Sequence, residues 1–217
     1  MVMNENFTYF FEELGPPKLV QQPTETDLEK YRGKVPDSLI DFWTEAGWAG
    51  YAGGLFWSTD PDEFSPAIDA WLDGNSSGKK DVFTVIGRSA FGDLFLWGKN
   101  TGVSVTINPL VSTIITAEPD RNVVEGAPDL ALISFFATLD RGYLDFEDIK
   151  EKRLFDRALK KLGPLKNDEM YAFEPALALG GAPKIENLSK LKIIEHLVLL
   201  SQIAEIKYLH MDITGHV

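Results

Sequence analysis

Three carboxylates stand shortly after an aromatic residue in the first half of the chain: Asp60, Asp62 and Glu63 follow Trp57. A pair of carboxylates beside an aromatic ring is the arrangement with which glycosidases protonate a leaving group and hold a sugar. The sequence does not give the distance between these carboxyl groups, and acid-rich turns after strands are also common on protein surfaces. A small-ligand or carbohydrate-binding or hydrolysing module built on Trp57 and its neighbouring acids is therefore one open interpretation.

The other residue types that carry chemistry have no productive spacing. His196, His210 and His216 do not form a metal-binding pair on one helical face, and the chain has no cysteine. The glycine-flanked segment at 87–92 has one residue too many for a nucleophile elbow, and the segment at 74–80 departs from a phosphate loop. The sequence therefore predicts no catalytic residue, no metal and no cofactor, and a protein that is not an enzyme.

An aromatic, glycine-rich run, WTEAGWAGYAGGLFW, occupies residues 43–57 just before these acids. Trp43 belongs to an apolar helical pattern that ends at Gly47, so it is expected in the core. The glycines after it predict a tight loop that leaves Trp48 and Tyr51 free to be exposed, followed by a strand that begins at Leu55. Exposed Trp and Tyr side chains are common anchors of protein interfaces; packing over the edge of a sheet is the alternative.

The negative charge of the chain is concentrated in its first part. The net charge is −12, and residues 1–135 hold 20 acidic against 9 basic side chains, whereas residues 136–217 hold 13 against 12. The interval between Lys34 and Lys79 contains no basic residue but eight acids: Asp37, Asp41, Glu45, Asp60, Asp62, Glu63, Asp69 and Asp73. Such a field repels nucleic acid and anionic membranes and attracts a basic protein or a cation; an ordinary solvated surface is the alternative.

Patterns of apolar residues predict both helices and strands. Helices are expected at 4–14, 24–31, 36–46, 65–71, 128–139 and 148–162 and in a long C-terminal segment capped by Ser189. Strands are expected at 55–57, 82–86, 94–97, 103–107, 111–116 and 170–173. These elements predict an α+β fold. An antiparallel sheet with flanking helices forms an N-terminal domain, 1–135, on which a smaller, mostly helical domain, 136–217, is packed.

The order of several short motifs resembles a known pair of domains. VPDSLIDFW at 35–43, Gly47-Trp48, GLFW at 54–57 and RSAFGD at 88–93 together resemble the GAD-like domain. ALKKLGP at 158–164 and EMYAFEPALALGG at 169–181 are similar to the small C-terminal domain that accompanies it in immunity proteins of bacterial type VI secretion systems. The resemblance covers most of the chain and brings no catalytic residues.

The resemblance implies an immunity protein that binds and neutralises a cognate secreted toxin, in the best-known cases a DNase. Because a nuclease presents a positive face to phosphate, an acidic inhibitor would occlude that face. The residues expected to bind the partner are aromatic and acidic: Trp48, Tyr51, Trp57, Asp60, Asp62, Glu63, Asp69 and Asp73. A scaffold of the secretion apparatus is a third hypothesis.

The same residues lead to an expected location and set of partners. The N-terminal residues lack the pattern of a secretory signal, and no apolar run is long enough to span a membrane. A cytoplasmic protein that binds a toxin, without direct contact to nucleic acid or membrane, is therefore expected.

Overall fold

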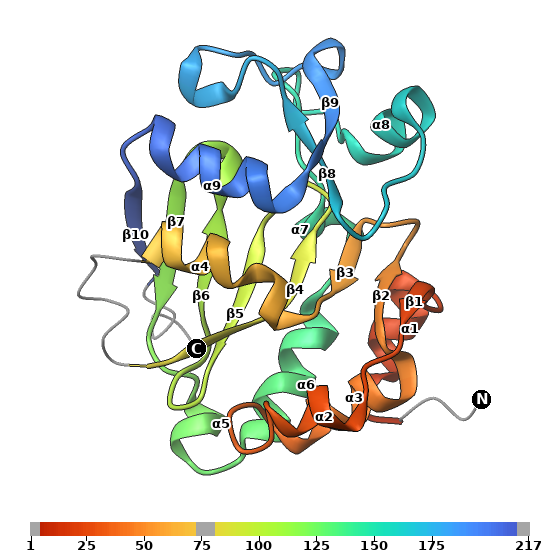
Figure 1. Cartoon of the computed structure of the whole chain (residues 1–217), viewed down its shortest axis with the longest axis vertical. Coiled ribbons are helices and arrows are strands. Elements are labelled where there is room, and N and C mark those ends of the chain that lie inside the picture. Colours follow the sequence, from red (N-terminus) through yellow and green to blue (C-terminus); the bar gives the residue numbers. More distant parts are fainter. Residues whose placement is uncertain (1–4, 73–80, 212–217) are drawn as a thin grey trace.

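An eight-stranded sheet forms the centre of the molecule in the computed structural model, which describes residues 5–72 and 81–211 (Figure 1). The strands are β1 (Lys18–Gln21), β2 (Trp48–Tyr51), β3 (Phe56–Ser58), β4 (Phe83–Ser89), β5 (Leu94–Gly98), β6 (Gly102–Asn108), β7 (Thr113–Ala117) and β10 (Lys207–Met211), in this spatial order. Neighbouring strands from β1 to β7 are antiparallel, which agrees with the antiparallel sheet expected from the sequence, although β1 and β2 were not predicted as strands. β10 lies parallel to β7, with Tyr208 opposite Ile114.

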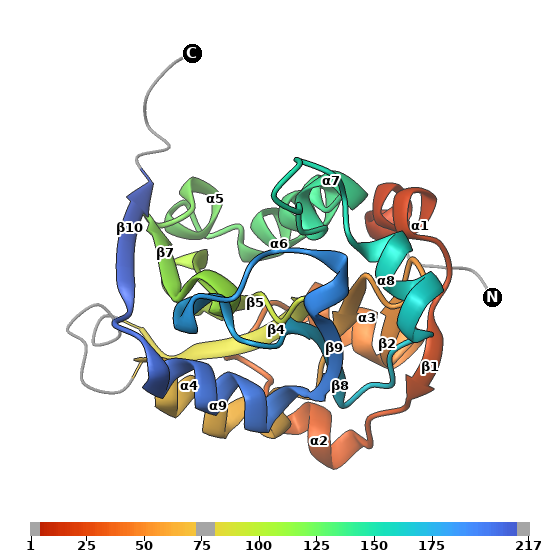
Figure 2. The same cartoon turned by 90° about the horizontal axis from the view of Figure 1, so that it is seen from above.

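Helices cover both faces of this sheet. They are α1 (Thr8–Leu14), α2 (Glu25–Glu29), α3 (Asp37–Ala46), α4 (Ser65–Leu72), α5 (Arg121–Val124), α6 (Pro128–Thr138), α7 (Arg141–Leu144), α8 (Phe155–Leu162) and α9 (Ile193–Ile203). Short 3-10 helices are η1 (Glu5–Phe7), η2 (Pro61–Phe64), η4 (Pro109–Val111), η5 (Leu177–Leu179) and η6 (Ile185–Asn187). Figure 2 shows α4 and α9 on one face of the sheet and α5, α6 and α7 on the other. The predicted α+β class is confirmed.

Local sequence signals fix several helix ends. Thr24 accepts a hydrogen bond from the backbone N–H of Asp27 at 3.2 Å, and the Asp27 carboxylate accepts one from the N–H of Thr24 at 3.0 Å. This reciprocal pair is a capping box that satisfies two otherwise unpaired donors at the start of α2. Gly47 ends α3 with φ of +70°, a conformation that a side chain disfavours.

A cluster of aromatic rings fills the space between the sheet and the helices α1, α3 and α6. Phe10 lies at its centre, with ring centroids 4.8 Å from Tyr51, 5.1 Å from Phe136, 5.5 Å from Phe56 and 5.7 Å from Phe42. Most of these pairs meet edge to face, the geometry that ring quadrupoles favour. Because the rings come from three helices and two strands, the cluster joins the N-terminal elements to the sheet.

Several contacts attach the C-terminal residues to the sheet and to the helices that cover it. On the α4 face, the indole N–H of Trp71 donates to the carbonyl of Leu197 at 2.9 Å. A hairpin of β8 (Glu169–Phe173) and β9 (Leu188–Lys192) reaches the sheet where the N–H of Tyr171 donates to the carbonyl of Ala90 at 2.9 Å. In addition, β10 lies in the sheet itself. The division of the chain at residue 135 stays a prediction.

The loop predicted around Trp48 and Tyr51 is wrong, because both residues lie in strand β2. Gly50 makes this strand possible: it pairs with Trp57, and a Cβ at position 50 would lie 3.0 Å from the Trp57 ring. The tight turn comes later, at Gly53 and Gly54, which have φ of +75° and +95°. The glycines therefore serve a close approach between strands as well as a turn.

Two predicted helices begin later than expected. The carboxylate of Asp148 accepts hydrogen bonds from the N–H groups of Lys150 and Lys152, which holds an irregular turn in place of a helical start. The helix begins at Phe155, whose N–H donates to Asp145 at 2.9 Å. Ser189 does not cap the last helix, because it lies in β9 opposite Ala172.

Replacing Phe136 with alanine tests the aromatic cluster. Phe136 has no exposed surface, so Phe136→Ala should lower the free energy of unfolding by about 3–5 kcal/mol through lost burial and a residual cavity. Leu130→Ala is the control on the same helix, because that side chain is 52% exposed and should change stability by less than about 0.5 kcal/mol. Urea titration followed by tryptophan fluorescence measures both. Equal losses in the two variants would contradict the assignment of the core.

Candidate partner-binding surface

The three aromatic residues expected to anchor a partner are buried. Trp48, Tyr51 and Trp57 keep 5%, 0% and 3% of their surface exposed. The expectation that they project from the surface is therefore wrong: alternate residues of β2 point to opposite faces of the sheet, and both faces are covered by other elements. Tyr51 lies in the aromatic cluster, and Trp48 lies near Trp43 with ring centroids 6.3 Å apart.

Trp57 is held by its own turn and by a buried arginine. Its indole N–H donates to the carbonyl of Gly54 at 2.9 Å, and the guanidinium carbon of Arg88 lies 4.8 Å from the ring centroid. The terminal nitrogens of Arg88 donate to the carbonyls of Ser89, at 3.2 Å, and Asn167, at 2.7 Å. Burial lowers the pKa of Arg88 to about 9, while the charges of Asp168 and Glu63 act in the opposite direction. The guanidinium is therefore still charged at neutral pH.

Arg88 belongs to the RSAFGD motif, but the sequence did not mark it as a residue of the site. It has no exposed surface, and no carboxylate of the described residues lies within ion-pair distance of it. Its sequence signal is a lone arginine in the otherwise uncharged strand FTVIGRS. A buried charge of this kind is costly and points to a structural or functional demand.

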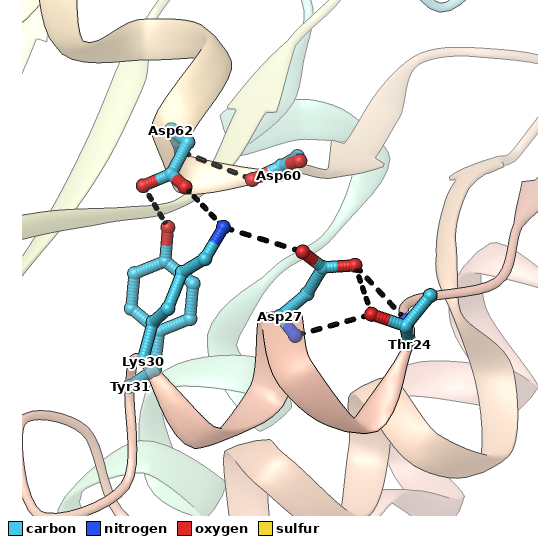
Figure 3. A network of polar contacts seen from close by, with 6 residues as sticks. All are labelled: Thr24, Asp27, Lys30, Tyr31, Asp60 and Asp62. Atoms are coloured by element: carbon cyan, nitrogen blue, oxygen red, sulfur yellow. Dashed lines mark hydrogen bonds and ion pairs between the residues drawn. The ribbon is translucent and has the colours of Figure 1, made fainter.

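Asp62 is engaged within the chain (Figure 3). Its carboxylate accepts a hydrogen bond from the hydroxyl of Tyr31 at 2.5 Å and forms an ion pair with Lys30 at 2.9 Å, and Lys30 also reaches Asp27 at 3.3 Å. The Tyr31 and Lys30 contacts hold the pKa of Asp62 below its usual value. The network joins α2 to η2, so Asp62 is not free to pair with a partner.

The carboxylates of Asp60 and Glu63, unlike that of Asp62, form no ion pair with the described residues. The carboxylate of Asp60 accepts a hydrogen bond from the backbone N–H of Asp62 at 3.0 Å and so caps η2. Burial raises the pKa of this half-buried carboxyl group. Glu63 makes no hydrogen bond or ion pair with the described part of the chain, and burial also raises its pKa. Together they border a pocket that also involves Trp57 and Arg88.

This pocket does not support the interpretation as a carbohydrate site. Its volume is about 20 Å³, whereas sites that enclose small ligands typically measure roughly 300–1,000 Å³. Trp57 is stacked on Arg88 and cannot present an open face to a sugar ring. The pocket can admit only a group with a few heavy atoms.

The acids of the interval without basic residues do not all share one face of the sheet. Asp37 and Asp41 lie on α3, which packs against α6, whereas Asp69 lies on α4, which packs against α9. The helices α6 and α9 cover opposite faces (Figure 2). Asp73 lies outside the described residues. The acids of this interval therefore do not form one surface. Glu63 on η2 and Asp69 on α4 are the two that remain candidates for contact with a partner.

Other kinds of site are not found in the described part of the chain. Within residues 5–72 and 81–211, no group of three or more His, Asp or Glu side chains is placed to hold a metal ion. Over the same residues, no helix has the length and apolar composition needed to cross a membrane.

Comparisons with known proteins identify two domains in the chain. Residues 5–111 match the family described as GAD-like domain, and residues 129–204 match the family described as T6SS immunity protein Tdi1, C-terminal. Both matches confirm the resemblance seen in the sequence. No curated protein matches the chain. A crystal structure of Atu4351 from Agrobacterium tumefaciens is similar with a TM-score of 0.85 and 22% identity over 96% of this chain and 93% of that one, which supports the fold.

Replacing Asp62 with asparagine tests the network in Figure 3. The pKa of Asp62 is lowered in the folded protein, so its contribution to stability is complete above the unfolded value of about 4 and is lost as the pH falls through the lowered pKa. Asp62→Asn should therefore melt lower than the wild type at pH 7, by on the order of 2 °C for such an exposed pair, and the difference should vanish in acid. Melting temperatures at several pH values measure this.

Asp69→Asn is the matched control, because Asp69 is exposed and has no partner among the described residues. Its melting temperature should follow that of the wild type at every pH. A deficit in Asp62→Asn that stays constant from neutral to acid pH would show that the ionised carboxylate does not stabilise the network.

Proposed function

Because the chain carries a GAD-like domain followed by the C-terminal domain of a T6SS Tdi1 immunity protein, we propose that it binds and neutralises a cognate type VI secretion toxin. The match of residues 129–204 is the observation that carries this proposal. Neutralisation by binding needs no catalytic group, so the proposed protein is not an enzyme and uses no cofactor. Its proposed place of action is the cytoplasm, where an incoming toxin has to be met.

The toxin is proposed to be a DNase with a basic substrate-binding face. An enzyme that binds DNA presents positive charge to the phosphates, and an inhibitor with a net charge of −12 is attracted to the same face. Binding there excludes DNA without any chemical step. Electrostatic complementarity of this kind accelerates association and falls with increasing ionic strength.

Glu63 and Asp69 are the carboxylates proposed to meet the toxin. Each lacks a partner among the described residues, and each is exposed on the α4 side of the sheet. By contrast, the charge of Asp62 is already compensated by Lys30. Because the aromatic residues of this region are buried, carboxylates rather than rings supply the first contact in this proposal.

Reversing the two free carboxylates tests this surface. The double variant Glu63→Lys/Asp69→Lys should bind a DNase toxin that the wild-type protein neutralises at least about tenfold more weakly, mainly through slower association, because like charges replace attraction. Glu205→Lys is the control, since Glu205 is an exposed acid of the C-terminal residues without a partner in the described chain. Surface plasmon resonance at low and high salt, with a nuclease assay, measures the effect.

The two outcomes that would oppose the proposal are distinct. Unchanged association of the double variant would reject the placement of the interface on η2 and α4. Full nuclease activity in the presence of saturating wild-type protein would reject neutralisation of this toxin.

A further inference from the structure

The strand β10 forms one edge of the eight-stranded sheet, and Figure 1 and Figure 2 both show it at the margin, beside β7. It pairs with β7 over all five of its residues, from Lys207 to Met211, without a register shift. No other strand of the described residues pairs with its outer side. All five residues are exposed, and the large apolar side chains of Tyr208, Leu209 and Met211 keep 49%, 53% and 46% of their surface. An edge of this kind is a template on which another strand can pair.

The opposite edge of the sheet is irregular by comparison. There, β1 pairs with β2 at Lys18 and Gln21, with a register shift between these two residues. Leu19, which lies between them, has a positive φ of 54°. Such an irregularity bends an edge strand and hinders the addition of a further strand. β10 has neither a bulge nor a proline, and its one lysine, Lys207, stands at its first position.

The register of β10 identifies the backbone groups that it leaves free. Lys207 donates its N–H to the carbonyl of Ser112, so the backbone groups of Lys207 face β7. Successive residues of a strand direct these groups to opposite sides, so Leu209 also faces β7. Tyr208 and His210 therefore direct their N–H and C=O groups outward. Two donors and two acceptors stand on the outer side, placed symmetrically about Leu209.

A second copy of the same strand, running antiparallel, satisfies all four groups at once. When the two Leu209 residues lie opposite each other, each Tyr208 lies opposite a His210, and the residues of such a pair exchange both hydrogen bonds. The arrangement has the two-fold symmetry of an isologous interface. Moving its centre to Tyr208 would place His210 opposite Ile206, which lies outside the strand. The register centred on Leu209 is therefore the one that uses every free group.

The charge of this edge favours a second copy over a basic toxin. The segment 205–211 holds one acid, Glu205, and one lysine, Lys207, and β7 holds no charged residue. The ring of His210 is paired with Glu118, with 3.3 Å between Nε2 and the carboxylate. Two copies that each carry a net charge of −12 repel each other, and they do so least where the surface is nearly neutral. In the antiparallel arrangement Lys207 lies opposite Met211, so no like charges face each other.

We propose that β10 pairs with β10 of a second copy of this chain, which gives a homodimer whose sheet continues across the two-fold axis. Because the pairing strand has only five residues, the two copies are in a reversible, concentration-dependent equilibrium. The interface is separate from the surface proposed to meet a toxin. Glu63 lies on η2, which packs near β4, and the strands β5, β6 and β7 stand between β4 and β10.

Two substitutions at one position test the backbone pairing. His210→Pro removes an outward N–H that β7 does not use, so β10 can remain in its own sheet while the dimer loses one hydrogen bond from each copy. The dissociation constant of the dimer should rise at least about tenfold. His210→Ala is the matched control, because it removes the same side chain but keeps the N–H, and it should dimerise more tightly than His210→Pro. Sedimentation velocity of the full-length protein over a concentration series measures the constants, and melting temperatures verify folding.

Leu209→Lys tests the centre of the interface without changing the backbone. The substitution places two ammonium groups close to the two-fold axis, so dimerisation should weaken at least about tenfold at low salt and recover in part at high salt. Leu199→Lys is its control, because Leu199 lies on α9 with 48% of its surface exposed and gives the same change in charge away from β10. This control should dimerise like the wild type.

Three results would overturn the pairing of β10 with itself. The first is a wild-type protein that remains monomeric at every concentration. The second is a dimer that persists unchanged in both His210→Pro and Leu209→Lys, which would place the interface elsewhere. The third is a monomeric wild type in which His210→Pro weakens binding of a DNase toxin that the protein neutralises; β10 would then accept a strand of the toxin, and the proposed immunity function would stand.

Discussion

The guanidinium of Arg88 lies against the ring of Trp57 with no exposed surface, and the arrangement of the surrounding elements depends on this contact. Taking a charge out of water costs several kcal/mol unless other groups compensate for it. Here the compensation comes from the Trp57 ring and from the carbonyls of Ser89 and Asn167. Because Asn167 precedes β8, the same contact also links the sheet to the C-terminal residues.

The burial of Trp57 and Trp48 limits how the protein can recognise a partner. With these aromatic rings inside, the exposed part of the region around η2 and α4 consists mainly of polar and acidic side chains. A partner that met this region would therefore contact carboxylates before aromatic rings. Asp60, which caps η2, and Asp62, which holds α2, show that acids of one short run serve different purposes.

The C-terminal residues pack against the sheet and its helices and also supply one of its strands. Trp71 donates to Leu197 across the α4 and α9 layer, and β10 extends the sheet beyond β7. Both GAD-like and immunity-domain residues therefore contribute to one continuous packing arrangement. A disturbance in α9 would be expected to reach α4, the helix that carries Asp69.

The sequence alone determined the α+β class, the antiparallel pairing of β4, β5 and β6, and the ends of α3, α4 and α6, because apolar periodicity, capping residues and glycines act over a few neighbouring positions. It also identified the acidic interval and the resemblance to the two families. Only the tertiary structure decided that Trp48 lies in a strand, that Asp62 is paired with Lys30, and that β10 joins the sheet. Those outcomes depend on residues distant in sequence, whose pairing in space sets burial and charge compensation and leaves no local pattern.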